Sequence, residues 1–134
     1  MEFMREYEKW LTSPALSQAE KDELTALKDD PKEIEARFYG PLEFGTAGLR
    51  GIMAVGLHNM NVHVIRHATQ AFARVILEEG GDAAKRGVAI CMDCRSHSMD
   101  FAREAAGVCV AKRGVRAPTS SNAPVRVRCS SGFA

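Results

Sequence analysis

Apolar positions at helical spacing, broken by polar turns, predict short helices over the first part of the chain. Tyr7, Trp10 and Leu11 fall on one face of the first predicted helix. Three local signals mark where these helices end and begin. They are the interruption Ser13-Pro14, the capping-box sequence Ser17-Gln-Ala-Glu20, and the helix start Asp30-Pro31. We therefore expect an N-terminal helical segment over residues 1–43.

Residues 40–60 follow a different pattern. They contain five of the chain's 11 glycines and a single acidic residue, which predicts a loop with short extended pieces. From Asn61 onward an amphipathic helix is expected, ending at Gly80-Gly81 in the manner of a C-cap. Its predicted apolar face consists of Val64, Ile65, Ala68, Ala71, Phe72, Val75 and Ile76.

The uninterrupted apolar run Gly87-Val-Ala-Ile-Cys-Met92 predicts a strand buried on both faces. Ser98 is expected to cap a further helix, in which Phe101, Ala105, Val108 and Cys109 share a face, and residues 115–117 could begin another strand. This order indicates an α/β fold: a helical segment, then a partial mixed or parallel sheet with crossover helices over residues 44–117.

Composition is that of an ordinary soluble domain, with 46% hydrophobic and 26% charged residues, and no run is long enough to span a membrane. Cytoplasmic location is the expectation. Charge is uneven, because residues 1–43 carry 11 acidic and 6 basic residues, whereas residues 111–134 carry 5 basic residues and no acidic one. The basic stretch 118–134 lacks apolar periodicity and is expected to be disordered.

Three side-chain groups suggest chemistry but favour structural roles. Cys91-Met-Asp-Cys94 has redox or zinc half-site spacing, yet no second pair accompanies it, so reduced, buried cysteines are expected. His63 and His67 could face one metal ion from a helix, but no third ligand is evident. Ser96-His97-Ser98 is similarly a poor nucleophile and base pair, because adjacent side chains seldom reach one substrate atom.

The candidate phosphate site is the loop Phe44-Gly-Thr-Ala-Gly-Leu-Arg-Gly51. Its closely spaced glycines let the backbone approach a ligand, and backbone N–H groups in such a turn can bind an anion. Arg50 adds a planar, permanently charged group suited to phosphate oxygens, and Thr46 adds a hydroxyl. On these residues alone, a structural glycine turn with an exposed arginine is the alternative.

Asp93 and Arg95 directly follow the predicted strand 87–92. In open α/β sheets the carboxyl ends of strands border the ligand crevice, so both side chains are candidates for substrate binding. A surface salt bridge is the alternative interpretation.

A longer set of residues carries a family resemblance. The run Arg37-Phe-Tyr39, Leu42 to Met53, and then Met60-Asn61, Arg66, Ala68-Thr-Gln70, Asp93-Cys-Arg95, Ser98 and Phe101-Ala102 resembles the start of the α-D-phosphohexomutase family, the phosphoglucomutases and phosphomannomutases. The resemblance extends over about residues 5–117 and favours a functional loop over the structural turn.

The resemblance implies an isomerase that interconverts 1-phospho and 6-phospho sugars through a phosphoserine, with Mg²⁺ and a glucose 1,6-bisphosphate-type activator. It implies catalytic roles for Arg50 and Thr46, and substrate or phosphate binding by Gly45, Gly48, Gly51, Asp93 and Arg95. A phosphosugar is the implied partner, with neither nucleic acid nor a membrane. No metal ligand is assigned within these residues.

Several family features do not occur in these 134 residues. They are the Thr-Ala-Ser-His-Asn-Pro serine motif, the Asp-Gly-Asp-x-Asp metal loop, the sugar-selecting loop and the C-terminal phosphate-binding domain. Relatives also usually carry Thr-Asn-Arg where Leu57-His58-Asn59 stands, which puts a basic contact of this loop in doubt. The fragment alone is therefore expected to be inactive.

The segment after Ala117 departs from the family pattern. A frameshift near Pro118 would account for the loss of acidic residues, and the nucleotide sequence tests it, because the alternative frame should encode a Tyr-Ile-Phe-Glu strand. Two alternatives to a mutase remain: a polyanion-binding module that uses the basic stretch 118–134, and a truncated remnant without function.

Overall fold

The computed structural model describes residues 2–46, 48–86, 88, 90 and 97–111. The chain divides into two compact units, Met1–Val64 and Ile65–Ala134. The division falls inside helix α4 (Val62–Glu79), near its N-terminal end. The first unit thus contains both the predicted helical segment and the glycine-rich loop, while the predicted domain limits at residues 43 and 117 stay predictions.

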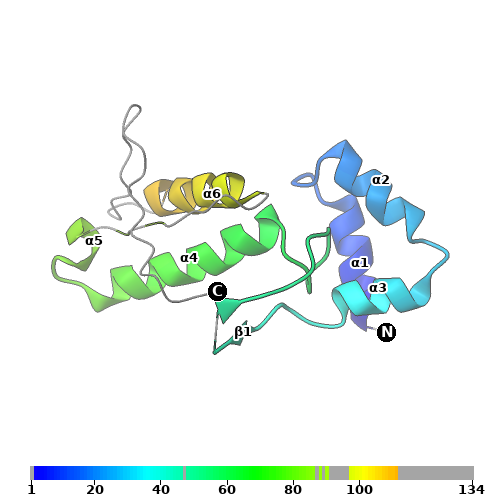
Figure 1. The fold of residues 1–134 in the computed structure, drawn as a ribbon, viewed down its shortest axis with the longest axis horizontal. Helices are drawn as coiled ribbons and strands as arrows, with labels where there is room; N and C mark the ends of the chain where they lie inside the picture. Colours follow the sequence, from blue (N-terminus) through cyan, green and yellow to red (C-terminus); the bar gives the residue numbers. More distant parts are fainter. Residues whose placement is uncertain (1, 47, 87, 89, 91–96, 112–134) are drawn as a thin grey trace. The chain divides into compact units, whose positions relative to one another are not determined.

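Three helices form the N-terminal part of the first unit: α1 (Glu2–Thr12), α2 (Gln18–Ala26) and α3 (Pro31–Phe38) (Figure 1). Their boundaries follow the predicted signals. Helix α1 ends just before Ser13-Pro14, and Ser17 and Glu20 form both halves of the capping box at the start of α2. Asp30 caps α3 by accepting a hydrogen bond from the Glu33 N–H, with proline at the first helical position. The helical prediction is confirmed.

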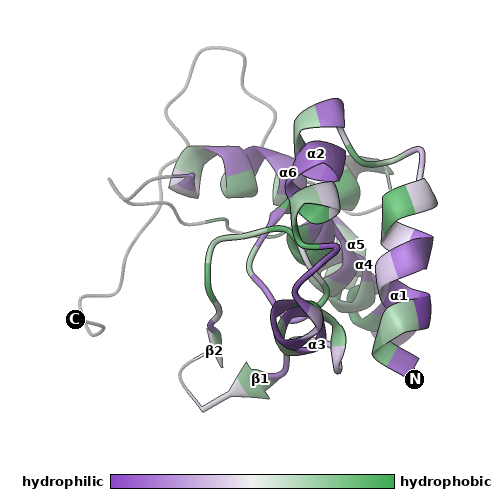
Figure 2. Ribbon diagram, turned by 90° about the vertical axis from the view of Figure 1, so that its right-hand side faces the viewer, coloured by the Kyte–Doolittle hydropathy of each residue, from purple (hydrophilic) through white to green (hydrophobic). Residues whose placement is uncertain are grey.

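The core of this unit is built from one apolar face of each helix. Hydrophilic and hydrophobic residues alternate along α1 in the manner of an amphipathic helix (Figure 2). Tyr7 and Trp10 both meet the ring of Phe38 edge-on, with centroid distances of 5.8 and 5.7 Å. The Tyr7 hydroxyl donates to the Leu24 carbonyl oxygen at 2.8 Å, which satisfies the polar end of a buried ring. The buried members are Tyr7, Leu16, Leu24, Ile34, Phe38 and Val55.

The glycine-rich segment after α3 is a loop with short extended pieces, as predicted. Strands β1 (Phe44–Gly45) and β2 (Gly48–Leu49) pair antiparallel, with Phe44 opposite Leu49 and Gly45 opposite Gly48. Beyond them, Met53 and Met60 form an isolated parallel bridge. Val55 lies between these two residues and is buried in the helical core, so the loop packs against the helices.

Two buried asparagines fix the shape of this loop. The Asn59 amide donates to the Val55 carbonyl oxygen at 3.1 Å, and the Asn61 amide donates to those of Ala54 and Gly56 at 3.0 and 2.8 Å. The Asn61 side-chain oxygen accepts from the Val64 N–H at 3.0 Å and thereby caps α4. Buried amides require such partners, because an unsatisfied one costs about 1–3 kcal/mol.

The second unit contains the rest of α4, the short helix α5 (Ala83–Arg86) and α6 (Ser98–Ala111). Helix α4 stops as predicted, at Gly80 and Gly81, whose φ angles of 73° and 59° end the helix. Ala73 and Cys109 form the buried centre of the unit, with Ile76, Ala84 and Val88 packed against them. Burial raises the pKa of the Cys109 thiol, in keeping with an inert packing role.

The predicted apolar face of α4 is only partly correct. Ala73, outside the predicted set, is fully buried, whereas Phe72 and Val75 are 53% and 62% exposed, and Ala71 is also exposed. The buried side of α4 is the side that carries Ala73 and Ile76, and it packs against Cys109 of α6. Within the described residues the Phe72 side of α4 is therefore uncovered.

Helix α6 begins at Ser98, with His97 before it in the left-handed region at φ 65°, so Ser98 is the first helical residue and not the cap. The predicted strand 87–92 and the extended residues 115–117 lie largely outside the described residues. The α/β class is thus shown in part, by helices and a two-stranded antiparallel sheet, and the parallel or mixed sheet stays a prediction. Of the helices that the structure describes, none has the length and apolar character to cross a bilayer.

The packing of Gly56 against α3 predicts the effect of a single methyl group. Gly56 has φ 142°, and a Cβ at this position would lie 2.9 Å from the Arg37 Cβ and 3.1 Å from the Arg37 carbonyl oxygen. We expect Gly56→Ala to lower the free energy of unfolding by roughly 1–3 kcal/mol, measured by urea denaturation. Gly40→Ala is the matched control and should change it little, because nothing lies within 4 Å of its Cβ position.

Glu20 predicts a pH-dependent contribution to stability. Burial raises the pKa of Glu20, but hydrogen bonds from Ser17 and the nearby His63 outweigh it, so its pKa is lowered in the folded chain. A lowered pKa stabilises the fold above the ordinary glutamate value of about 4.3, and this contribution is lost as the pH falls through the folded pKa. Glu20→Gln should therefore destabilise the chain at neutral pH and lose that effect in acid.

Urea denaturation at several pH values measures this difference. The single side-chain oxygen of glutamine can still accept from Ser17, so the substitution removes the charge together with the acceptor that faces His63. Glu8→Gln, at an exposed position on α1, is the control and should show no such pH dependence. A Glu20→Gln penalty that stayed constant down to about pH 3 would contradict the prediction.

Candidate functional site

The predicted phosphate loop is a β-hairpin that is exposed along β1 and half-buried along β2. Strands β1 and β2 run on either side of Thr46. Gly48 has φ 101°, a backbone conformation that residues other than glycine rarely adopt. Thr46 and Arg50 are both exposed. The hairpin therefore presents its hydroxyl and its guanidinium to solvent, where a ligand can reach them.

The base of this hairpin is tightly held. The Leu42 N–H donates to the Leu57 carbonyl oxygen at 3.3 Å, and the Met60 N–H donates to that of Ile52 at 2.8 Å. Gly51 lies between these two attachments, where a Cβ would be 3.0 Å from the Leu42 side chain and 3.3 Å from the Met60 nitrogen. Glycine at position 51 thus allows the close packing of the hairpin base. Arg50 directly precedes Gly51 and is held in place by this base.

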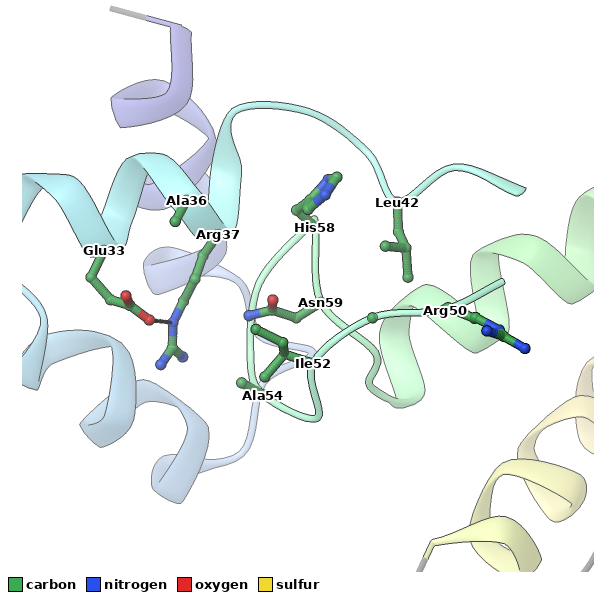
Figure 3. Close-up of a pocket in the computed structure, with 10 residues that line it drawn as sticks. Glu33, Ala36, Arg37, Leu42, Arg50, Ile52, Ala54, His58 and Asn59 are labelled. Atoms are coloured by element: carbon green, nitrogen blue, oxygen red, sulfur yellow. Dashed lines mark hydrogen bonds and ion pairs between the residues drawn. The ribbon is translucent and has the colours of Figure 1, made fainter. Parts of the chain in front are cut away.

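A pocket of about 280 Å³ lies beside this base (Figure 3). Its wall comes from α3, from the foot of the hairpin and from the loop that follows. The lining residues are Glu33, Ala36, Arg37, Leu42, Arg50, Gly51, Ile52, Ala54, His58 and Asn59. The side chain of Arg50 extends away from the Glu33–Arg37 end of the pocket.

The two arginines of the pocket differ in their availability. Arg37 bonds to Glu23 at 2.6 Å, to Glu33 at 2.9 Å and to the Val55 carbonyl oxygen at 3.1 Å. Burial lowers the pKa of Arg37, but its two carboxylate partners outweigh that and raise it. Arg50, in contrast, makes no hydrogen bond or ion pair with any residue that the structure describes. Arg50 is therefore the pocket arginine that can bind an anion.

His58 holds the loop against the segment that leads into the hairpin. Its backbone N–H donates to the Arg37 carbonyl oxygen at 2.9 Å. Ring atom Nδ1 lies 3.2 Å from the Gly40 carbonyl oxygen, and Nε2 lies 2.7 Å from the Tyr39 hydroxyl. A carbonyl oxygen only accepts, so Nδ1 carries a proton, and in the neutral ring Nε2 accepts from Tyr39.

The structure brings together five of the seven predicted site residues. Gly45, Thr46, Gly48, Arg50 and Gly51 lie on the hairpin or at its base, and Arg50 and Gly51 line the pocket. Asp93 and Arg95 lie outside the described residues, as do Cys91, Cys94 and Ser96. The roles assigned to all seven stay predictions.

The histidines do not form a metal site in the described part of the chain. His63 is half-buried and bonds to Glu20 at 2.9 Å, while its ring meets Trp10 edge-on. His67 is exposed. Among the described residues there is no group of three His, Cys, Asp or Glu side chains that could hold a metal ion.

Several residues that shape the site carried no recognisable signal in the sequence. Asn59 and His58 appeared only as a departure from a family pattern, yet both line the pocket. Val55 looks like an ordinary apolar residue, and Leu42 stood out only as part of the run that carries the family resemblance; the fold shows that both anchor the loop. Asn61 was the one residue with a usable signal, because asparagine directly before an apolar helix is a common N-cap.

The chain is similar in sequence to several known proteins. Residues 41–124 match the family model for phosphoglucomutase/phosphomannomutase, alpha/beta/alpha domain I. A phosphopentomutase of Mus musculus is 36% identical over 104 residues, which are 73% of this chain and 16% of the relative. A phosphoribomutase of Saccharomyces cerevisiae is 38% identical over 93 residues, 68% of this chain and 15% of the relative.

A phosphomannomutase of Mycoplasma pneumoniae is also similar, at 31% identity over 96 residues, 72% of this chain and 17% of the relative. The matched part of the chain thus spans about a sixth of the length of these relatives. No solved structure matches the chain significantly. The family match covers the hairpin, the pocket loop and α4, well over half of the chain. The chain therefore belongs to the phosphoglucomutase/phosphomannomutase family, in the region of its alpha/beta/alpha domain I.

Proposed function

We propose that this chain supplies the phosphate-binding wall of a phosphosugar mutase, an isomerase that interconverts 1-phospho and 6-phospho hexoses. The observation that carries the proposal is Arg50, an exposed guanidinium without a partner among the described residues, placed beside a pocket on a firmly held hairpin. A guanidinium in this setting binds phosphate through paired, charge-assisted hydrogen bonds. Family membership supplies the class of reaction.

Rigidity of the hairpin base supports this role. A charged group contributes most to binding when it is held in position before the ligand arrives, because less conformational freedom is lost. Backbone hydrogen bonds of Leu42 and Ile52 hold the two ends of the hairpin, and Arg50 lies two residues before Ile52. Thr46, at the exposed turn, supplies a hydroxyl that can bond to the same phosphate or to a sugar oxygen.

Glucose or mannose phosphate is the proposed substrate, on the family resemblance. The relatives named for their substrates include enzymes of pentose, ribose, mannose and glucose phosphates. The role proposed for Arg50 and Thr46 concerns the phosphate, which these sugars share. A pentose phosphate is accordingly the competing substrate in any binding experiment.

Mg²⁺ and a sugar bisphosphate activator belong to the same proposal. The described residues do not fit a Mg²⁺ site, since they provide no group of three candidate ligands, so no step is assigned to the ion here. The serine motif of the family does not occur in the 134 residues either. We therefore expect these residues to bind a phosphosugar without turning it over. A cytoplasmic location is part of the proposal.

Removal of the Arg50 guanidinium tests the phosphate site. Arg50→Ala should weaken the binding of glucose 1-phosphate at least about tenfold, because a hydrogen bond to a charged group contributes roughly 1.5–3 kcal/mol. Isothermal titration or NMR titration of the whole chain measures the affinity. Arg5→Ala removes an exposed arginine of the same unit and serves as the matched control, with affinity expected to be unchanged.

Two results would count against the proposal. Equal affinities for Arg50→Ala and the unaltered chain would show that the phosphate binds elsewhere. Equal loss in Arg5→Ala and Arg50→Ala would show that only overall charge matters. Ribose 5-phosphate in parallel titrations then distinguishes a general phosphate site from one that prefers a hexose.

A further inference from the structure

Tyr39 and His58 form a hydrogen-bonded pair at the surface of the first unit. The Tyr39 hydroxyl oxygen lies 2.7 Å from Nε2 of His58, and the centroids of the two rings are 4.3 Å apart. Tyr39 is 62% exposed, so a small molecule in solution can reach its hydroxyl. Figure 3 shows His58 on the loop that faces the segment leading from α3 to Leu42. The pair therefore places an accessible hydroxyl beside an imidazole.

Backbone hydrogen bonds to α3 hold both partners in place. Tyr39 is the C-cap residue of α3, and its N–H donates to the Glu35 carbonyl oxygen at 2.9 Å. The His58 N–H donates to the Arg37 carbonyl oxygen, also at 2.9 Å. Because the same helix anchors both residues, the hydroxyl and the imidazole are already in contact before any reagent arrives.

The imidazole presents its basic nitrogen to the hydroxyl. Nδ1 lies 3.2 Å from the Gly40 carbonyl oxygen, which can only accept, so Nδ1 carries the proton of the neutral ring. Nε2 then accepts from the Tyr39 O–H. A hydroxyl bonded to a base, with the base oriented by a third group, is the arrangement that activates hydroxyls for acyl transfer. Here the third group is a backbone carbonyl.

Tyr7, the other of the two tyrosines in the sequence, has the opposite surroundings. It is 5% exposed, and its hydroxyl donates to the Leu24 carbonyl oxygen. A backbone carbonyl accepts a hydrogen bond but is not a titratable base. Burial also raises the pKa of Tyr7, which disfavours loss of its proton. Tyr7 is therefore an internal reference for a phenol that is neither accessible nor activated.

We propose that Tyr39 is a site of covalent acylation, with His58 as its general base. The phenol oxygen attacks the carbonyl carbon of an activated acyl donor, such as an acyl thioester or an acyl imidazole, while the phenol proton moves to Nε2 of His58. The bond from that carbon to the leaving group then breaks, and the leaving group takes the proton from Nε2. An ester of Tyr39 and a neutral His58 remain. The site does not depend on the role proposed for Arg50.

Acetylation of the whole chain by N-acetylimidazole measures the reactivity of both phenols. Cleavage at arginine separates them, because Arg37 lies between Tyr7 and Tyr39, and mass spectrometry then gives the rate for each peptide. We expect Tyr39 to react at least about tenfold faster than free N-acetyltyrosine amide, since a positioned general base typically contributes about a hundredfold or more. Tyr7 should stay unlabelled while the chain is folded.

Three variants assign the effect. Tyr39→Phe should abolish labelling of the peptide 38–50, which also contains Thr46. His58→Gln can still bond to the hydroxyl but cannot take up its proton, so Tyr39 should react no faster than the free amide. His67→Gln removes an exposed histidine elsewhere and should leave the rate unchanged. Labelling of Tyr7 in any variant would reveal that the helical core has opened.

The comparison with the free amide decides the proposal even where a variant does not fold. A Tyr39 rate in the unaltered chain equal to that of N-acetyltyrosine amide would overturn it. An unchanged rate in folded His58→Gln would reject His58 as the base. An acetyl group found on His58 in place of Tyr39 would show that the imidazole itself is the nucleophile, which also contradicts the proposal.

Discussion

The attachment of the glycine-rich loop to the end of α3 is the constraint on which the rest of the first unit depends. Arg37 bonds to the Val55 carbonyl oxygen, its own carbonyl accepts from the His58 N–H, and Gly56 packs against its Cβ. Val55 then completes the core between the helices. With the loop held in this way, the hairpin that carries Arg50 has a fixed base, although its tip is exposed to solvent.

Local signals were sufficient to predict the helices. The capping box at Ser17, the Asp30-Pro31 start and the Gly80-Gly81 stop act through neighbouring residues in the chain, so the sequence records them directly. The candidate phosphate loop stood out for the same reason. Its glycines and Arg50 lie within eight consecutive residues, and the structure keeps them on one hairpin.

Features that depend on distant contacts could not be predicted in this way. The apolar residues of α4 do not show which side meets Cys109, and the small Ala73 turned out to be the buried residue while Phe72 is exposed. Nor does the sequence show that His58 reaches Tyr39 and Gly40, since an imidazole in a loop has many possible partners. Asp93 and Arg95, which would complete the predicted site, lie outside the described residues.

The hydrogen bonds of Asn61 restrict the chemistry of that position more narrowly than helix capping does. As a cap alone, aspartate would serve as well as asparagine, because only an oxygen acceptor is required. Here the other end of the side chain is an NH₂ group that faces the carbonyl oxygens of Ala54 and Gly56. A carboxylate would place negative charge against those oxygens in a buried setting. Deamidation of Asn61 replaces this NH₂ group by an oxygen. It would thus keep the N-cap of α4 but remove the hydrogen bonds to Ala54 and Gly56 that hold the loop below the hairpin.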